Sequence, residues 1–207
     1  MVDLIKTYFS LTDTQEQQFA ALGVLYPEWN NKINVISRKD IDNLYEHHIL
    51  HSLAIARLLR FTPDTKILDV GTGGGFPGIP LAIMFPHCHF TLIDGTGKKV
   101  MVAHEIAKSI GLQNTECKHL RAEDEKDSYD FAVSRAAMSL TDLVKLVRKN
   151  ISHTGQHNAL PNGLICLKGG ELQSEIRPLR NIASLYNLSD YFKEEYFKTK
   201  KAIYLPL

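Results

Sequence analysis

The strongest structural signal in this chain lies in residues 67–78, Ile67-Leu-Asp-Val-Gly-Thr-Gly-Gly-Gly-Phe-Pro-Gly78. The first four residues predict a buried strand, and the glycines after it predict a sharp turn whose backbone a ligand can approach closely. Pro77 and Pro80 fit the first turn of a helix, where a missing N–H costs little. A strand, a glycine turn and a helix in this order start a βαβ unit, which indicates an α/β fold.

The spacing of the glycines bears on which ligand the turn would hold. Gly73, Gly75 and Gly78 fit the dinucleotide pattern G-x-G-x-x-G, so the glycines alone are a weak signal. However, Gly71 directly follows the strand, and Asp69 stands two residues before it. This D-x-G-x-G-x-G order is typical of turns that bind S-adenosylmethionine (AdoMet), so we expect the methionine end of AdoMet at this turn. A turn that merely connects a strand to a helix is the structural alternative.

Strands and helices alternate along the chain after this turn. Apolar runs predict strands at 89–93, 115–120, 129–134 and 163–168, separated by helices at 79–85, 100–110 and 140–151. Two further strands, 183–192 and 197–207, are expected to form a hairpin that closes one edge. The sequence therefore predicts a doubly wound, mostly parallel α/β sheet with a C-terminal antiparallel edge.

The first 62 residues differ from the rest because helical spacing dominates there. Phe19, Leu22 and Tyr26 recur at intervals of three or four, and Thr62-Pro-Asp64 ends the pattern. We expect residues 1–62 to form an N-terminal helical extension packed on the core. Residues 63–207 are expected to form the main domain, with both parts in a single compact unit.

Composition and charge exclude several classes of protein. Lys and Arg number 24 against 23 Asp and Glu, and this net charge of +1 argues against a strongly basic protein that wraps nucleic acid. The 3 cysteines are widely spaced, so we expect neither a disulfide framework nor a bound metal. No apolar run is long enough for a membrane span or a leader, which predicts a cytoplasmic protein without a membrane partner. We expect a monomer.

Polar residues follow three of the later strands, at the edge where ligands bind in open α/β sheets. Asp94 ends the second strand, where a carboxylate can accept hydrogen bonds from both ribose hydroxyls of AdoMet; capping of the next helix is its structural alternative. Ala122-Glu123 follows the third strand and could flank the adenine edge, although Glu123 is one of several acids in that loop. Arg135 ends the fourth strand and is expected to face the same crevice.

Several groups of residues together resemble the bacterial small-subunit ribosomal RNA methyltransferase G family (glucose-inhibited division protein B). They follow the family's order and spacing: 69–80, Asp94 with Gly97-Lys98-Lys99, Ala122-Glu123, Ser134-Arg135-Ala136 and Leu167-Lys168-Gly169. The likeness extends upstream through Asn34 and His48-Ile-Leu-His-Ser52, with two departures. His51 stands where the family usually carries Asp, and Val35-Ile36 stands where it usually carries Leu-Thr.

The resemblance implies a class I (Rossmann-like) AdoMet-dependent methyltransferase that methylates guanine N7 in 16S rRNA of the small ribosomal subunit. It also implies AdoMet contacts at Gly71, Phe76, Ala122, Glu123 and Arg135. We add Gly73, Gly75 and Asp94 to this cofactor-binding set from the glycine turn and the second strand.

The chemistry that the residues can support is compatible with this target. The Asn/Asp-Pro-Pro-Tyr/Phe motif of many exocyclic-amine methyltransferases does not follow the fourth strand, and Cys88, Cys117 and Cys166 lie in or beside strands, where they are poor candidate nucleophiles. Guanine N7 carries a lone pair and no proton, so its methylation needs no general base. We therefore assign no catalytic residue and give Arg135 a positioning role.

A basic rim around the crevice would recognise RNA. Its candidates are Arg38, Lys39, Lys98, Lys99 and Lys168. The three histidines at 47, 48 and 51 are expected to bond a carbonyl or a carboxylate rather than a metal. A methyltransferase of small molecules and a non-catalytic AdoMet-binding ribosome-assembly factor stay open as alternatives, and a nicotinamide oxidoreductase is the least favoured.

Overall fold

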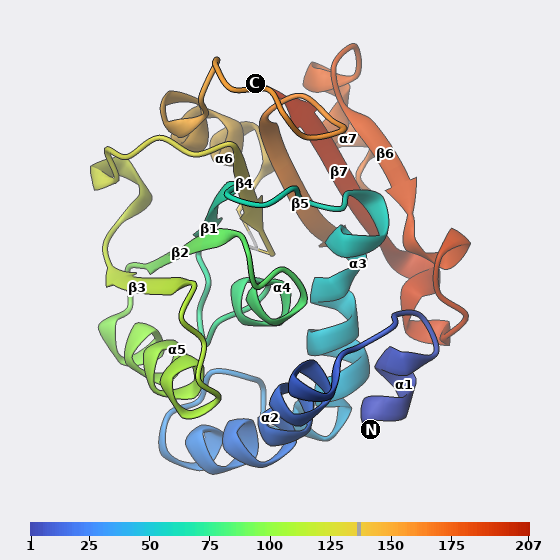
Figure 1. Ribbon diagram of the computed structural model, residues 1–207. Helices are drawn as coiled ribbons and strands as arrows, with labels where there is room; N and C mark the ends of the chain where they lie inside the picture. Colours follow the sequence, from blue (N-terminus) through green and yellow to red (C-terminus); the bar gives the residue numbers. More distant parts are fainter. Residues whose placement is uncertain (136–137) are drawn as a thin grey trace.

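A single seven-stranded sheet forms the centre of the computed structural model, which describes residues 1–135 and 138–207 (Figure 1). The strand order within the described residues is β3-β2-β1-β4-β5-β7-β6. The strands are β1 (Lys66–Val70), β2 (His89–Asp94), β3 (Thr115–His119), β4 (Phe131–Ser134), β5 (Gly163–Gly169), β6 (Ser184–Asn187) and β7 (Lys200–Pro206). The first five are parallel, and β7 runs antiparallel to both β5 and β6. This confirms the doubly wound α/β fold with an antiparallel C-terminal edge.

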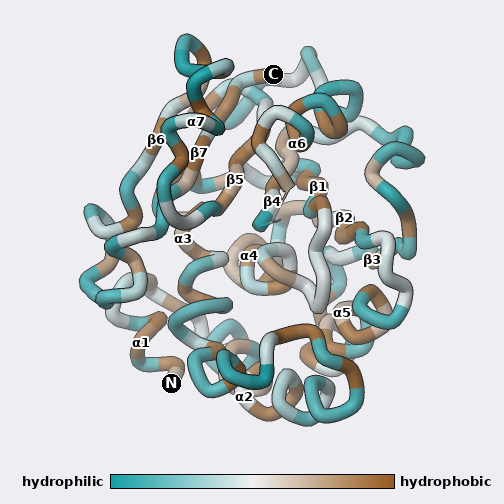
Figure 2. The backbone as a smooth tube through the Cα atoms, turned by 180° about the vertical axis from the view of Figure 1, so that it is seen from behind, coloured by the Kyte–Doolittle hydropathy of each residue, from teal (hydrophilic) through white to brown (hydrophobic). Residues whose placement is uncertain are grey.

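Both faces of the sheet are apolar, because alternate residues of each strand enter one of two cores. Ile67 of β1 packs with Phe90 and Phe131 on one face, whereas Leu68 packs with Ala132 and Leu164 on the other. Hydrophobic residues accordingly run along the central strands in Figure 2, and polar residues gather in the outer loops. The sheet is therefore buried between two helical layers.

Helices cover the two faces unequally. The first face carries α4 (Gly78–Met84) and α5 (Gly97–Ser109), and the second carries α6 (Leu140–Val147) and the short α7 (Gln173–Ile176). In Figure 1 the first layer lies below the sheet and α6 lies above it. Because the crossovers leave β1 and β4 in opposite directions, the strand order reverses between these two strands, which is where such folds bind ligands.

The N-terminal segment adds a second helical layer below α4. It contains α1 (Val2–Lys6), α2 (Asp13–Lys32), a 3₁₀ turn at Ile41–Asn43, a π-helix, η2 (Leu44–Leu50), and α3 (His51–Leu58). The α2 helix begins with a capping box, in which the Thr12 hydroxyl accepts from the Gln15 N–H and the Gln15 side chain accepts from the Thr12 N–H. Phe19, Leu22 and Tyr26 of α2 are buried in the same core as the first face of the sheet. No helix in the described part of the chain has the length and apolar character to cross a membrane.

The C-terminal hairpin forms, but its strands are shorter than expected. The strands cover only 184–187 and 200–206, and 3₁₀ turns at Leu188–Asp190 and Glu195–Thr199 replace parts of both predicted strands. The reason is that Phe192 and Phe197 stack on each other at 4.5 Å between centroids and anchor the connection in the core. The apolar residues that suggested long strands therefore hold a buried loop.

Gly163 at the start of β5 provides a test of the β5–β7 pairing. An added Cβ at this position would lie 2.1 Å from the backbone oxygen of Leu205, which cannot move without disturbing β7. Gly163→Ala is expected to lower the free energy of unfolding by about 2–3 kcal/mol, measured by urea denaturation. Gly169→Ala on the same strand is the matched control, because its Cβ would first meet the flexible end of Lys200. Equal stabilities of the two variants would contradict this account.

Candidate active site

The glycine turn leaves the carboxyl end of β1; Gly71 is exposed and Gly73 is partly buried, whereas Gly74 and Gly75 are buried. Gly73 and Gly75 have φ angles of 57° and 108°, a left-handed region that favours glycine. A Cβ on Gly73 would have no atom within 4 Å, so open space lies beside this residue. A Cβ on Gly75, in contrast, would collide with Ile79 of α4. The turn therefore packs tightly on its helix and is open to a ligand at Gly73.

Asp69 lies in the core under the glycine turn and bonds to residues at both ends of the turn. Its Oδ2 accepts hydrogen bonds from the Thr72 hydroxyl at 2.6 Å and from the Gly78 N–H at 2.8 Å. The residue is fully buried, and burial raises the pKa of its carboxyl to about 7. Asp69 thus ties the start of the turn to the start of α4.

Asp94 braces the same turn from β2. Its Oδ2 accepts from the Gly73 N–H at 2.9 Å, and its Oδ1 accepts from the Thr96 N–H at 2.8 Å, in the loop before α5. Each oxygen retains a second lone pair for a ligand hydroxyl. The structure therefore brings Asp94 to the turn as expected and gives it a bracing contact that the sequence did not reveal.

The end of β3 lies next to Asp94. The Leu120 N–H donates to the Asp94 carbonyl, and Ala122 and Glu123 follow in a 3₁₀ turn, Ala122–Asp124. Ala122 is partly buried and the Glu123 side chain is exposed, while the Glu123 carbonyl accepts a hydrogen bond from Lys149. The glycine turn, Asp94 and Ala122 therefore follow one another along the ends of β1, β2 and β3.

The N-terminal helices support the glycine turn, which the sequence did not indicate. The Tyr26 hydroxyl donates to the Gly74 carbonyl at 2.9 Å, and its ring stacks on Phe76 at 4.6 Å. Val35 packs so closely on Gly74 that a Cβ there would lie 2.7 Å away. The helical spacing of Tyr26 predicted a buried face but not a hydroxyl directed at the turn.

Arg135 connects this turn to the histidine-containing helix η2. Its guanidinium carbon lies 4.9 Å from the centroid of the Phe76 ring. One terminal nitrogen donates to the His47 carbonyl at 3.1 Å, and the other lies 3.0 Å from Nδ1 of His48. Its neighbour Ala136, part of the Ser-Arg-Ala motif, lies outside the described residues.

The contact with Arg135 fixes which ring nitrogen of His48 carries the proton. Because the guanidinium can only donate, Nδ1 of His48 accepts, and the ring proton lies on Nε2, which donates to Oδ2 of Asp40 at 2.7 Å. Burial, followed by the charge of Arg135, lowers the pKa of His48 to about 4. The other Asp40 oxygen lies 2.6 Å from Nδ1 of His47. Asp40, His48 and Arg135 therefore form a continuous hydrogen-bonded chain that ends over Phe76.

A cavity of about 530 Å³ opens beside Arg135. It lies at the carboxyl ends of β4 and β5, and the residues lining it include His47, His48, His51, Arg135, Lys168, Tyr196 and Lys200. Among the predicted RNA contacts only Lys168 lies here, and its ammonium group already donates to Glu175 at 2.5 Å and to the Met138 carbonyl at 2.6 Å. Arg38, Lys39 and Lys98 are exposed outside this cavity, and Lys99 is partly buried in the first turn of α5. We call this space the histidine cavity.

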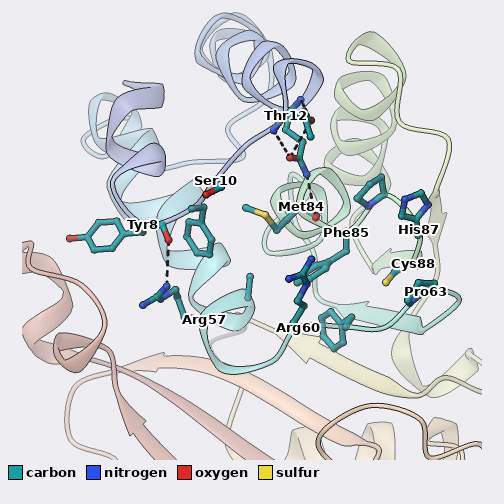
Figure 3. Close-up of a pocket in the computed structure, with 15 residues that line it drawn as sticks. Tyr8, Ser10, Thr12, Arg57, Arg60, Pro63, Met84, Phe85, His87 and Cys88 are labelled. Carbon is teal, nitrogen blue, oxygen red and sulfur yellow. Dashed lines mark hydrogen bonds between the residues drawn. The ribbon is translucent and has the colours of Figure 1, made fainter.

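A larger cavity, of about 620 Å³, lies beside the segments that precede β1 and β2, at the amino ends of these strands (Figure 3). Arg57, Arg60, Phe85 and Cys88 are among its lining residues, and Cys88 directly precedes β2. None of the residues predicted from the sequence lies there. Cavity size alone would therefore point to the opposite end of the strands from the residues predicted from the sequence.

The chain is similar along its whole length to proteins with one common name. The family model described as rRNA small subunit methyltransferase G matches residues 15–202. A protein of Phocaeicola vulgatus named ribosomal RNA small subunit methyltransferase G is 61% identical over 207 residues, which cover 100% of this chain and 99% of that protein. A protein of Bacteroides fragilis with the same name is 59% identical over 204 residues, which cover 99% and 98% of the two chains.

Solved structures with similar folds are methyltransferases of distant sequence. A Thermus thermophilus 16S rRNA N2 G1207 methyltransferase in complex with AdoMet and guanosine superimposes with a TM-score of 0.57 at 13% identity, covering 78% of this chain and 43% of that one. A SAM-dependent methyltransferase from Aquifex aeolicus gives a TM-score of 0.54 at 14% identity, with coverages of 82% and 98%. At these identities the likeness concerns the fold alone, and it identifies a class I AdoMet-methyltransferase fold.

The state of His48 predicts a pH dependence of stability. Its pKa is about 4 in the folded protein against an ordinary value near 6.5, so the unfolded chain binds more protons between these two values. The contribution of His48 is therefore complete above about pH 6.5 and is lost as the pH falls towards 4, by up to about 3 kcal/mol. Unfolding free energies measured across this range should decline less in His48→Asn, whose amide oxygen can still accept from Arg135. Parallel pH profiles for the variant and the unaltered protein would refute the assignment.

Proposed function

The chain belongs to the rRNA small subunit methyltransferase G family, and on that basis we propose that it methylates N7 of a guanine in 16S rRNA within the small ribosomal subunit. AdoMet is the methyl donor, and it supplies an electrophilic methyl group on a sulfonium. N7 is supported as the acceptor because the titratable groups around the glycine turn and Arg135 are held in hydrogen bonds or buried, which leaves no good general base.

These groups already make the hydrogen bonds that a general base would need free. Both ring nitrogens of His48 are engaged, by Asp40 and Arg135. Each oxygen of Asp94 accepts a backbone N–H, and its remaining lone pairs are assigned to the ribose. Oδ1 of Asp69 has no partner in the described part of the chain, but Asp69 is fully buried and its Oδ2 is held by Thr72 and Gly78, so Asp69 is shielded from an acceptor base outside the core. Nε2 of His51 has no partner in the described part of the chain, but burial holds the pKa of His51 well below its ordinary value, so His51 is a weak base at neutral pH. An acceptor atom without a proton suits such a site.

The open side of the glycine turn fits the cofactor, since a Cβ on Gly73 would occupy free space there. In this proposal Gly71, Gly73, Gly75 and Phe76 hold the methionine end. Asp94 accepts the ribose hydroxyls, and Ala122 and Glu123 flank the adenine. Arg135, held by His48 and the His47 carbonyl, positions the acceptor base beside Phe76.

The exposed cations extend the proposed RNA contact beyond the cavity. Arg38 and Lys39 follow the segment that packs on Gly74, and Lys98 and Lys99 lie in the first turn of α5, directly after the Asp94 loop. We therefore assign these four residues, together with Lys168, to contact with the subunit. A ribosomal substrate implies a cytoplasmic location, and we expect the enzyme to act as a monomer.

Methyl transfer to isolated subunits tests the proposed reaction. Small subunits from a strain that lacks this protein are incubated with labelled AdoMet, and the 16S rRNA is digested to nucleosides. We expect the label in 7-methylguanosine, at a single-turnover rate that does not rise with pH between about 6 and 8, because no base must lose a proton. Label in an N1- or N2-methylguanosine would refute the N7 assignment, and label in no RNA would refute the proposed substrate.

The assignment of Asp94 to the ribose can be tested by calorimetry. Asp94→Ala removes a charge-assisted acceptor and should weaken the binding of S-adenosylhomocysteine about tenfold or more, from a loss of roughly 1.5–3 kcal/mol. Asp124→Ala, which removes an exposed carboxylate from the loop after β3, is the control and should leave the affinity unchanged. An unaltered affinity in Asp94→Ala would remove Asp94 from the cofactor site.

A further inference from the structure

The histidine cavity contains cations without anionic partners. Among the described residues, Arg135 donates to the His47 carbonyl and to the neutral His48 ring, so it keeps its full charge. Lys200 has its ammonium group 4.4 Å from the centroid of the Tyr196 ring and makes no ion pair with a described carboxylate. Lys168, in contrast, is neutralised by Glu175. Two cations without a direct ion pair therefore line one cavity, and its three cations (Arg135, Lys168, Lys200) outnumber its two carboxylates (Glu171, Glu175) by one.

His51 gives an independent indication that this cavity receives a ligand. The residue is 4% exposed and lines the cavity, and its Nε2 is buried without a hydrogen-bond partner in the described part of the chain. Its other nitrogen, Nδ1, lies 3.2 Å from the Tyr196 hydroxyl. A buried polar atom without a partner is costly, and a ligand that bonds to it removes the cost.

The shape of the cavity favours an anion over a stacked base. The Tyr196 ring is stacked on His47 at 3.8 Å, and Lys200 lies over the same ring, so Tyr196 already has two ring partners. Lys200 lies at the start of β7, opposite Gly169, whose missing side chain leaves room for the ammonium group. Arg135 and Lys200 offer hydrogen-bond donors, whereas of the two carboxylates in the lining Glu175 is paired with Lys168 and Glu171 is exposed. The oxygens of a backbone phosphate are acceptors, so they match the two cations.

We propose that the histidine cavity binds a backbone phosphate of the RNA next to the target guanosine, through Arg135, Lys200 and His51. The Tyr196 hydroxyl lies 3.3 Å from the His47 carbonyl, to which it can donate, and 3.2 Å from Nδ1 of His51. In this arrangement the hydroxyl proton turns to Nδ1 of His51, and Nε2–H donates to a phosphate oxygen. The inference rests on the proposed function, since it places the RNA strand beside the proposed base position at Phe76. The residues that line the cavity come from η2, α3, the position after β4, β5 with the segment 171–175 that follows it, Tyr196 and β7. None comes from the glycine turn, which separates the cavity from the site assigned to the methionine carboxylate of AdoMet.

Lys200→Gln tests this site, and Lys201→Gln is its matched control. The two variants lose the same charge at adjacent positions of β7, but successive strand residues face opposite sides, and Lys201 lines a different cavity. Methyl transfer to unmethylated small subunits is measured over a series of salt concentrations. Lys200→Gln should raise KM about tenfold and reduce the slope of log KM against log salt by about 0.7–1, as loss of one phosphate contact does. Lys201→Gln should change neither quantity.

Two further measurements separate the phosphate site from its alternatives. The affinity for S-adenosylhomocysteine should be the same in both variants; a loss in Lys200→Gln alone would assign the cavity to the cofactor carboxylate and overturn the proposal. Inorganic phosphate should shift the ¹⁵N signal of His51 saturably in the unaltered protein and in Lys201→Gln, but not in Lys200→Gln. This binding test does not depend on methyl transfer. It therefore tests the phosphate site even if the unaltered enzyme labels no subunits and the proposed function fails. Equal behaviour of the two variants in all assays would refute the site.

Discussion

The two hydrogen bonds on Oδ2 of Asp69 are the constraint on which the arrangement of the site depends. They join the end of a buried strand to the Thr72 hydroxyl and the Gly78 N–H, and so fix where the turn ends and where α4 begins. These two donors favour the charged form of Asp69, whereas burial opposes it and raises the pKa of the carboxyl to about 7; Oδ1 has no partner in the described residues. With the turn held from inside, Asp94 and Tyr26 can brace its outer residues, and Phe76 is placed under Arg135.

Much of the fold could be predicted from the sequence because its signals are local. Buried parallel strands are short apolar runs, and β1, β2 and β5 appear where such runs occur. In the C-terminal tail these local signals do not predict the structure. Leu188, Phe192 and Phe197 have the apolar character of strand residues, but they are buried as anchors of an irregular connection. Only tertiary contacts distinguish an apolar residue of a buried strand from an apolar residue that anchors a loop in the core.

The candidate site also has a part that local sequence patterns predict and a part that only the fold brings together. The glycine turn, Asp94 and Arg135 follow strand ends and were found from local patterns. The histidine cavity joins η2, the ends of β4 and β5 and the start of β7, which lie far apart in the sequence. Lys200 and Tyr196 stand in no recognisable motif, and the role of His51 depends on a hydroxyl from across the molecule. A site assembled from such segments becomes visible only when the fold is known.

The burial of Arg135 affects which residues can replace it during evolution. Burial lowers the pKa of Arg135, which shows that the fold keeps a charge where water is scarce and gives it, in the described residues, only neutral acceptors. A buried charge of this kind reduces the stability of a protein compared with an apolar side chain of similar size. Selection for heat resistance alone would therefore favour an apolar side chain at position 135, at the expense of the contacts that Arg135 makes beside the glycine turn.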